Sequence, residues 1–173
     1  MLRTGKEMAM NEELHEIADL VRRTFERIAL AEGYSNDLQG LCGRAAVQVC
    51  LEAEQRGIPL RLVAAEGHAF SMTEDGEIVD VTATQFNYHD GIPSDGYGPI
   101  EIGRDHHDGL PWWYEEEESW ADVREWLAEG THNDLYYARS CWQKDRQKVI
   151  LERARRNPAQ MVFPSTKEEI HGS

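Results

Sequence analysis

Hydrophobic residues recur at helical spacing through the first part of the chain. Between residues 11 and 32 the repeating apolar positions are Leu14, Ile17, Ala18, Val21, Phe25 and Ile28. This period places them on one face of a helix. Asn11 is a favourable N-cap and Gly33 a favourable helix stop. We therefore predict a first helix from about Asn11 to Glu32.

The pattern then changes to shorter apolar runs. Helical spacing resumes at Cys42 and stops at the Gly-Ile-Pro turn of residues 57–59, which predicts a second helix with Cys42 at its start. Three runs typical of strands follow, at residues 60–65, 68–73 and 77–82. Helices followed by strands predict an α+β fold, with the helices packed on a small antiparallel sheet.

The turn between the second and third runs decides which side chains share a face. A two-residue loop of Asp75 and Gly76 would place His68 and Asp80 on opposite faces of the sheet. A three-residue loop that begins at Glu74 would make them diagonal neighbours on one face. A type I turn followed by glycine in the left-handed conformation produces the three-residue form. We therefore predict that His68 and Asp80 lie on the same face.

The second half of the chain begins with a loop-rich segment. Glycine and proline are frequent over residues 87–114, which predicts a long ordered loop beside any site. Ser119 and Asp122 form a capping-box pattern for a helix that ends at Gly130. Helical spacing predicts a last helix over residues 133–156, which makes C-terminal helices part of the expected fold.

Length and charge limit the functions that fit this chain. Its 173 residues are typical of one domain, here 1–173, with a candidate catalytic core at about 37–87 and a tail at 157–173. The formal charge is 18 − 32 = −14, which disfavours nucleic acid and favours a basic substrate region. No apolar stretch is long enough to span a membrane, and no secretory signal is visible, so we expect a cytoplasmic protein.

The three cysteines differ in their surroundings. Cys42, Cys50 and Cys141 form no C-x-x-C pair, and their odd number argues against a disulfide framework and against a cysteine zinc site. Cys50 and Cys141 lie within apolar helical patterns, where packing is the simplest interpretation. Cys42 instead follows a glycine-containing loop at a predicted helix start. Backbone N–H groups and the helix dipole there favour a thiolate, the form that attacks carbonyl groups.

Cys42, His68 and Asp80 together suggest nucleophilic catalysis. A histidine on an adjacent strand can accept the thiol proton and later return it to a leaving amine. A carboxylate on the next strand can fix the tautomer of that histidine. Each residue taken alone has a structural interpretation, but the order of Cys at a helix start, His on one strand and Asp on the next favours a catalytic triad.

Further residues are candidates for substrate binding around Cys42. The backbone N–H of Cys42, together with the side-chain amide of Gln39 or Asn36, is the predicted donor set for an oxyanion. Gly43 leaves room for a substrate backbone. Gln85 is expected to bond to loop backbone near the cleft.

The tryptophans and one histidine pair are the other conspicuous residues. Trp112 and Trp113 lie in the predicted loop and are candidates for a substrate wall or a partner contact. For Trp126 and Trp142 we expect core packing. The Asp-His-His-Asp run at 105–108 has the composition of a metal site but not a usual ligand spacing, so we expect a solvated loop.

Residues 37–87 resemble the catalytic core of the papain-like and transglutaminase-like cysteine hydrolase superfamily. The resemblance is carried by Leu-Cys-Gly-Arg at 41–44, Gly-His-Ala-Phe at 67–70 and the D-x-T-x-x-Q-F segment at 80–86, which is similar to one found in papain-fold toxin-like proteins. It implies that Cys42 is the nucleophile, His68 the general base and acid, and Asp80 the orienting carboxylate. It also implies an α+β fold and no metal.

These observations predict a cysteine-dependent amide-bond hydrolase or acyltransferase that acts through a thioester on a protein or peptide. No nucleotide, flavin or metal fingerprint is present, so we expect no cofactor. The main alternative is a catalytically silent domain that presents Trp112, Trp113 and the acidic run at 115–118 to a basic partner. Metal-dependent hydrolysis through His106 and His107 is a third, less favoured hypothesis.

Overall fold

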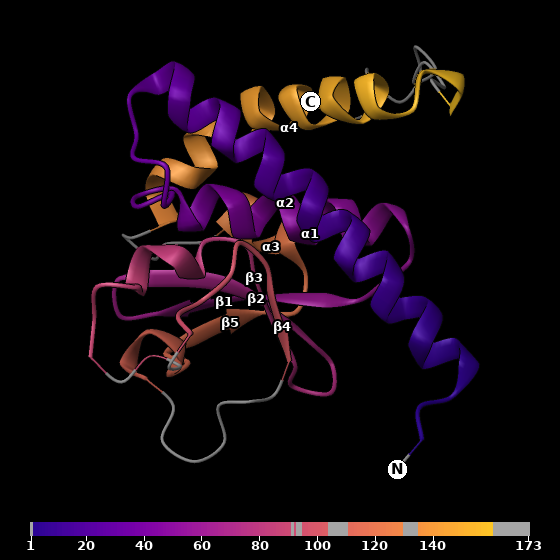
Figure 1. The fold of residues 1–173 in the computed structure, drawn as a ribbon, viewed down its shortest axis with the longest axis horizontal. Helices are drawn as coiled ribbons and strands as arrows, with labels where there is room; N and C mark the ends of the chain where they lie inside the picture. The colour runs from indigo at the N-terminus through magenta and orange to yellow at the C-terminus, as the bar shows by residue number, and fades with distance from the viewer. Residues whose placement is uncertain (1, 91, 93–94, 104–110, 130–134, 161–173) are drawn as a thin grey trace.

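The structure of the chain is a computed structural model that describes residues 2–90, 92, 95–103, 111–129 and 135–160. Helices lie together on one side of a sheet, as Figure 1 shows. The sheet has five antiparallel strands in the order β4-β3-β2-β1-β5. The fold is therefore α+β, with helices packed on a small antiparallel sheet, as the sequence pattern predicted.

Helix α1 (Gly5–Glu32) begins six residues before the predicted start at Asn11. Thr4 and Glu7 form a capping box, in which each side chain accepts a hydrogen bond from the backbone N–H of the other residue. The first two turns are mostly exposed, so the apolar period could not reveal them. The predicted end is confirmed, because Gly33 adopts the left-handed conformation (φ 81°) and caps the helix.

Helix α2 (Cys42–Gln55) is the central element of the helical layer. It packs against β1 and β2 on one side and against α1 and α4 on the other. Nearly all of its side chains are buried, and the second residue along, Gly43, is buried as well. Because both sides are covered by protein, the position of Cys42 at its first turn is fixed by the whole core.

The sheet has two long central strands and three short ones. Their bounds are β1 (Leu60–Ala65), β2 (His68–Thr73), β3 (Ile78–Asp80), β4 (Glu101–Gly103) and β5 (Glu118–Trp120). Strands β1 to β3 match the three predicted runs. The short outer strands β4 and β5 lie at the two edges and were not predicted.

The β2–β3 turn has the predicted three-residue loop. The Thr73 N–H donates to the Glu77 carbonyl at 2.9 Å, and the Gly76 N–H donates to the Thr73 carbonyl at 3.0 Å. Gly76 is in the left-handed region with φ 83°. In this register, Ser71 pairs with Val79 and Met72 with Ile78. His68 and Asp80 are consequently on one face of the sheet.

The two faces of the sheet are covered differently. Alternate residues such as Ala69 and Val79 pack into the core beneath the helices. The intervening residues face a second, smaller core made mainly of aromatic side chains. That core is covered by two 3₁₀ turns, η1 (Ala83–Phe86) and η2 (Trp112–Tyr114), and by Tyr97.

The C-terminal elements differ in part from the prediction. Ser119 lies in strand β5 opposite Val63 and does not open a helix. Helix α3 (Val123–Glu129) begins later, where the Asp122 carboxylate accepts the Arg124 N–H at 2.8 Å. The predicted helix end at Gly130 lies outside the described residues.

Helix α4 (Tyr136–Arg156) lies across α1 and α2 and is followed by a short turn, η4 (Pro158–Gln160). Ion pairs connect it to both of these helices. In the most deeply buried of them, the Arg44 guanidinium donates to both Asp145 carboxylate oxygens at 2.7 and 2.8 Å. Over the described part of the chain, no helix has the length and apolar character needed to cross a membrane.

Candidate active site

Cys42, His68 and Asp80 meet at one end of the sheet. Cys42 begins α2, His68 begins β2 and Asp80 ends β3. The histidine and the aspartate belong to the aromatic face, whereas Cys42 comes from the helical face. A small internal gap is lined by Cys42, Asp80 and Thr82 together, which shows that the two faces meet here. The three residues singled out from the sequence therefore lie in one site.

His68 and Asp80 are directly hydrogen-bonded. Nε2 of His68 lies 2.8 Å from Oδ2 of Asp80, and both side chains are almost completely buried. An ionised carboxylate only accepts hydrogen bonds, so Nε2 carries the proton. The other ring nitrogen, Nδ1, has no regular hydrogen-bond partner among the described residues. Nδ1 is therefore the nitrogen available to a neighbouring thiol.

Asp80 is held by three residues. His68 and the hydroxyl of Tyr114 donate to Oδ2, each at 2.8 Å. The backbone N–H and the hydroxyl of Thr82 donate to Oδ1 at 2.8 and 3.1 Å. Burial by itself would raise the pKa of Asp80, but the His68 charge and these hydrogen bonds outweigh it and lower the pKa. The carboxylate is thus ionised and fixed in orientation.

His68 is enclosed by aromatic rings. Phe86 contacts it edge-on with ring centroids 4.7 Å apart, and Phe70 and Tyr114 lie at 5.8 Å. Burial disfavours the charged imidazolium, but the charge and hydrogen bond of Asp80, with a further contribution from Cys42, raise the pKa of His68 to about 9. Protonated His68 is therefore favoured at neutral pH.

Cys42 is the partly exposed member of the group. It follows Leu41, the N-cap residue of α2, whose side chain makes no capping hydrogen bond. The N–H groups of a helix's first turn have no partner within the helix, so α2 itself leaves those of Cys42 and Gly43 without an acceptor. Cys42 is close enough to His68 for its sulfur to contribute to the raised pKa of the imidazole.

The loop before α2 is tied to the end of β3 by Arg22 of α1. The buried guanidinium donates to the Val81 carbonyl and the Thr84 hydroxyl, both at 2.9 Å, and to the Asn36 carbonyl at 3.3 Å. One side chain thus joins the segments that carry the thiol and the carboxylate. Leu38 in the same loop has φ 64°, an uncommon conformation for leucine that its complete burial maintains.

The two predicted oxyanion side chains, Asn36 and Gln39, are both exposed in the loop before α2. Gln39 is exposed, and its backbone N–H donates to Asp37. Asn36 is exposed and lines a surface hollow with residues of α1, so the structure does not support its amide as a donor to the site. Gln85 matches its prediction, because its amide donates to the Thr82 carbonyl at 2.9 Å.

Trp112 and Trp113 have different surroundings. Trp112 is 43% exposed, and its ring contacts Phe86 and His89 edge-on. Trp113 is 2% exposed and stacks on Phe86 at 4.7 Å, so it is a core residue. The interpretation of Trp113 as a substrate wall or partner contact is therefore wrong, whereas Trp112 keeps an accessible face.

The remaining cysteines do not belong to the site. Cys50 is buried and lies 3.4 Å from the Ser71 hydroxyl, and burial raises the pKa of its thiol to about 12. Cys141 is partly exposed on α4. Trp126 is buried and Trp142 is packed against the helical core, as the sequence predicted.

Three residues of the site were not identified from the sequence: Tyr114, Thr82 and Arg22. The spacing of Asp80 and Thr82 is that of an Asx turn and was an available signal. Tyr114 is 34 residues from Asp80, and Arg22 is 59 residues from Val81. No local pattern reports contacts of that separation.

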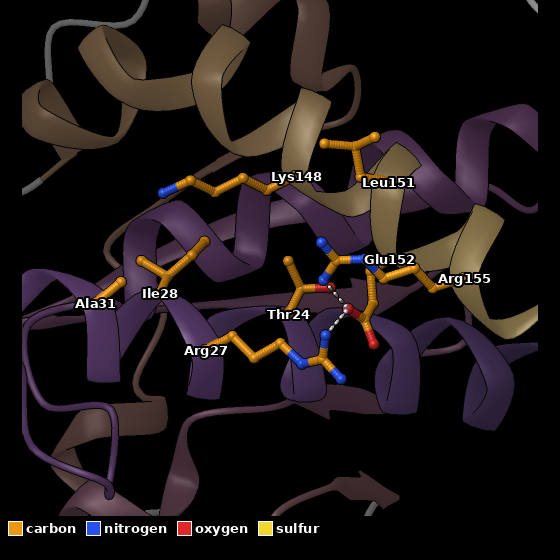
Figure 2. Close-up of a pocket in the computed structure, with 8 residues that line it drawn as sticks. All are labelled: Thr24, Arg27, Ile28, Ala31, Lys148, Leu151, Glu152 and Arg155. Atoms are coloured by element: carbon orange, nitrogen blue, oxygen red, sulfur yellow. Dashed lines mark ion pairs between the residues drawn. The ribbon is translucent and has the colours of Figure 1, made fainter.

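A hollow of about 190 Å³ lies between α1 and α4, as Figure 2 shows. Glu152 is buried at its centre, 2.9 Å from Arg27 and 4.0 Å from Arg155. The Arg27–Glu152 pair joins the two helices, whereas the Arg155–Glu152 pair lies within α4. The hollow contains none of the predicted site residues.

Within the described residues, no group of three His, Cys, Asp or Glu side chains is arranged to hold a metal ion. The 105–108 run, including His106 and His107, lies outside those residues. Comparisons with known proteins found no matching family model, no matching curated protein and no matching solved structure.

Proposed function

We propose that this chain is a cysteine-dependent hydrolase or acyltransferase that acts on amide bonds of a protein or peptide. The observation that carries the proposal is the buried His68–Asp80 hydrogen bond of 2.8 Å beside Cys42 at a helix N-terminus. The order of these residues along the chain resembles that of papain-like and transglutaminase-like enzymes, and this supports the same proposal.

The proposed reaction starts from an ion pair in which Nδ1 of His68 already holds the proton of the Cys42 thiol. The sulfur attacks the amide carbonyl carbon, and the carbonyl oxygen becomes an oxyanion. When the tetrahedral intermediate collapses, the C–N bond breaks and His68 returns the proton to the leaving amine. The product is a thioester on Cys42. Water then hydrolyses it to a carboxylic acid, or an amine forms a new amide.

Each neighbour has a defined task in this scheme. Asp80 keeps the proton on Nε2 and stabilises the imidazolium that forms. The N–H groups of Cys42 and Gly43 are the proposed oxyanion donors, since they lie at the positive end of the α2 dipole. The formal charge of −14 favours encounter with a basic substrate region.

Alkylation by iodoacetamide tests the nucleophile. Cys141 is the matched control, because it is partly exposed like Cys42 but lies on α4, outside the hydrogen-bonded group of His68 and Asp80. At pH 6 we expect Cys42 to be alkylated at least about tenfold faster than Cys141, as determined by peptide mass spectrometry. The Cys42→Ala variant should lose the fast phase and retain the near-UV circular dichroism of the wild-type chain.

An electrophilic peptide probe tests acyl transfer itself. The probe should acylate Cys42 in the wild-type chain, which mass spectrometry detects as the added mass of the acyl group. It should form no such adduct in the Cys42→Ala variant. Equal alkylation of Cys42 and Cys141, with no adduct on Cys42, would overturn the proposal and favour the silent binding module.

A further inference from the structure

Tyr114 makes a contact with Asp80 that the proposed reaction does not yet use. Its hydroxyl donates to Oδ2 at 2.8 Å, which is the same oxygen that accepts Nε2–H of His68. We propose that Tyr114 is a positioning residue of this site, which holds the Asp80 carboxylate against His68 and takes part of its negative charge. This inference rests on the proposed function.

The position of Tyr114 is fixed by the core. It ends the turn η2 and is 1% exposed. The preceding residue, Trp113, stacks on Phe86, and Phe70 contacts the Tyr114 ring edge-on at 5.1 Å. A hydroxyl held in this way meets Asp80 without first ordering a mobile side chain, so its hydrogen bond is preorganised.

Four donors share the Asp80 carboxylate. The two from Thr82 are local to the turn after β3, and the His68 bond crosses from β2. Tyr114 supplies the fourth from a segment on the aromatic face. Two donors on each oxygen fix the plane of the carboxylate, so that Oδ2 stays directed at His68.

Tyr114 remains a hydrogen-bond donor at neutral pH and well above it. Burial and the neighbouring Asp80 charge raise the pKa of its hydroxyl far above the usual range, with smaller contributions from Tyr97 and Glu101. The hydroxyl therefore stays protonated beside the carboxylate. Its hydrogen bond draws negative charge away from Oδ2. Without that bond, Oδ2 would be a stronger acceptor for Nε2–H of His68.

Removal of the hydroxyl has a defined consequence for His68. The titratable groups that face His68 include Cys42 of α2, Asp80 of β3 and Tyr114 of η2. Without the Tyr114 hydroxyl, Asp80 retains its charge but becomes a stronger acceptor, so the imidazolium is stabilised. A histidine that holds its proton more tightly is a weaker acid toward a leaving amine.

Titration of His68 by ¹⁵N-histidine NMR tests this directly. The Tyr114→Phe variant should raise the pKa of His68 by about half a unit or more, because one charge-sharing donor is lost. Tyr97→Phe is the matched control. The Tyr97 hydroxyl belongs to the same aromatic cluster but accepts a hydrogen bond from Trp113 and is not among the four donors to the Asp80 carboxylate. The His68 resonance is identified as the one missing from the spectrum of the His68→Gln variant.

An unchanged or lowered pKa of His68 in Tyr114→Phe would overturn the inference, as would an equal shift in Tyr97→Phe. Thr82→Val provides a second variant if Tyr114→Phe does not fold. It removes one hydroxyl donor from Oδ1 and keeps the backbone N–H, so the pKa of His68 should move in the same direction by a smaller amount. No movement there would also overturn the inference.

Probe acylation separates this inference from the proposed function. In Tyr114→Phe we expect the rate constant for acylation by the peptide probe to fall about two- to threefold for each half unit by which the pKa of His68 rises, with little change in probe affinity. An unreactive Cys42 in the wild-type chain would remove the proposed function, while the NMR titration would still report whether Tyr114 acts on His68.

Discussion

Nε2 of His68 and Oδ2 of Asp80 lie 2.8 Å apart, although the two residues are 12 positions apart on neighbouring strands. They meet because the β2–β3 turn contains three residues, which makes them diagonal neighbours on one face. A turn one residue shorter would place them on opposite faces. The pairing of an imidazole with a carboxylate therefore depends on one loop length.

Asp80→Asn should remove the negative charge beside His68 while keeping the shape of the side chain. The asparagine carries no charge, so burial dominates and the pKa of His68 should fall from about 9 to below its ordinary value of 6.5. Alkylation of Cys42 at pH 6 should slow by about tenfold or more, since fewer molecules hold an imidazolium beside the sulfur. The comparison is made by iodoacetamide labelling and ¹⁵N-histidine NMR.

Asp122→Asn is the control for that substitution. Asp122 caps α3 through the Arg124 N–H, and asparagine caps helices equally well. Its labelling rate should match that of the wild-type chain. A Cys42 that reacts equally fast in Asp80→Asn would contradict the role given to the carboxylate.

The free energy of unfolding should decrease as the pH rises from about 6.5 to 9. The pKa of His68 is raised from 6.5 in the unfolded chain to about 9 in the folded one, so the folded state binds more protons in this window. The stabilisation is complete below pH 6.5 and is lost as the pH rises through 9. A shift of this size corresponds to a loss on the order of 3 kcal/mol.

Urea denaturation of the wild-type chain and of His68→Gln at several pH values measures this loss. The variant should show a flatter dependence between pH 6.5 and 9, since the group responsible is absent. If the unfolding free energies of the two proteins depend on pH in the same way, His68 does not carry the raised pKa.

Arg44 should contribute more to stability than an exposed arginine with a similar ion pair. Arg44→Ala leaves Asp145, which is completely buried, without its partner, and should cost about 3–5 kcal/mol of unfolding free energy. Arg124→Ala breaks the pair with Glu54, in which both side chains are more than 40% exposed, and should cost at most about 1 kcal/mol. Similar losses by urea denaturation would contradict the conclusion that the buried Arg44–Asp145 pair stabilises the contact between α2 and α4.

Some parts of the fold follow from short segments and were predicted. The start of α2 at Cys42, the first three strands and the β2–β3 register depend on local spacing and on Gly76. The start of α1 was mispredicted because its first turns are held by a Thr4 capping box and pack against little. Strands β4 and β5 were missed because three residues carry no clear alternation.

The sequence by itself determined which residues can lie near one another along a helix, a turn or a strand pair, and this was sufficient for Cys42, His68 and Asp80. Only the tertiary structure decided what surrounds them: Tyr114 on the carboxylate, Arg22 between two loops and Trp113 inside the aromatic core. Periodicity records a residue's own burial within its element. It contains no information about which distant segment supplies the other half of a contact, because that depends on how the whole chain packs.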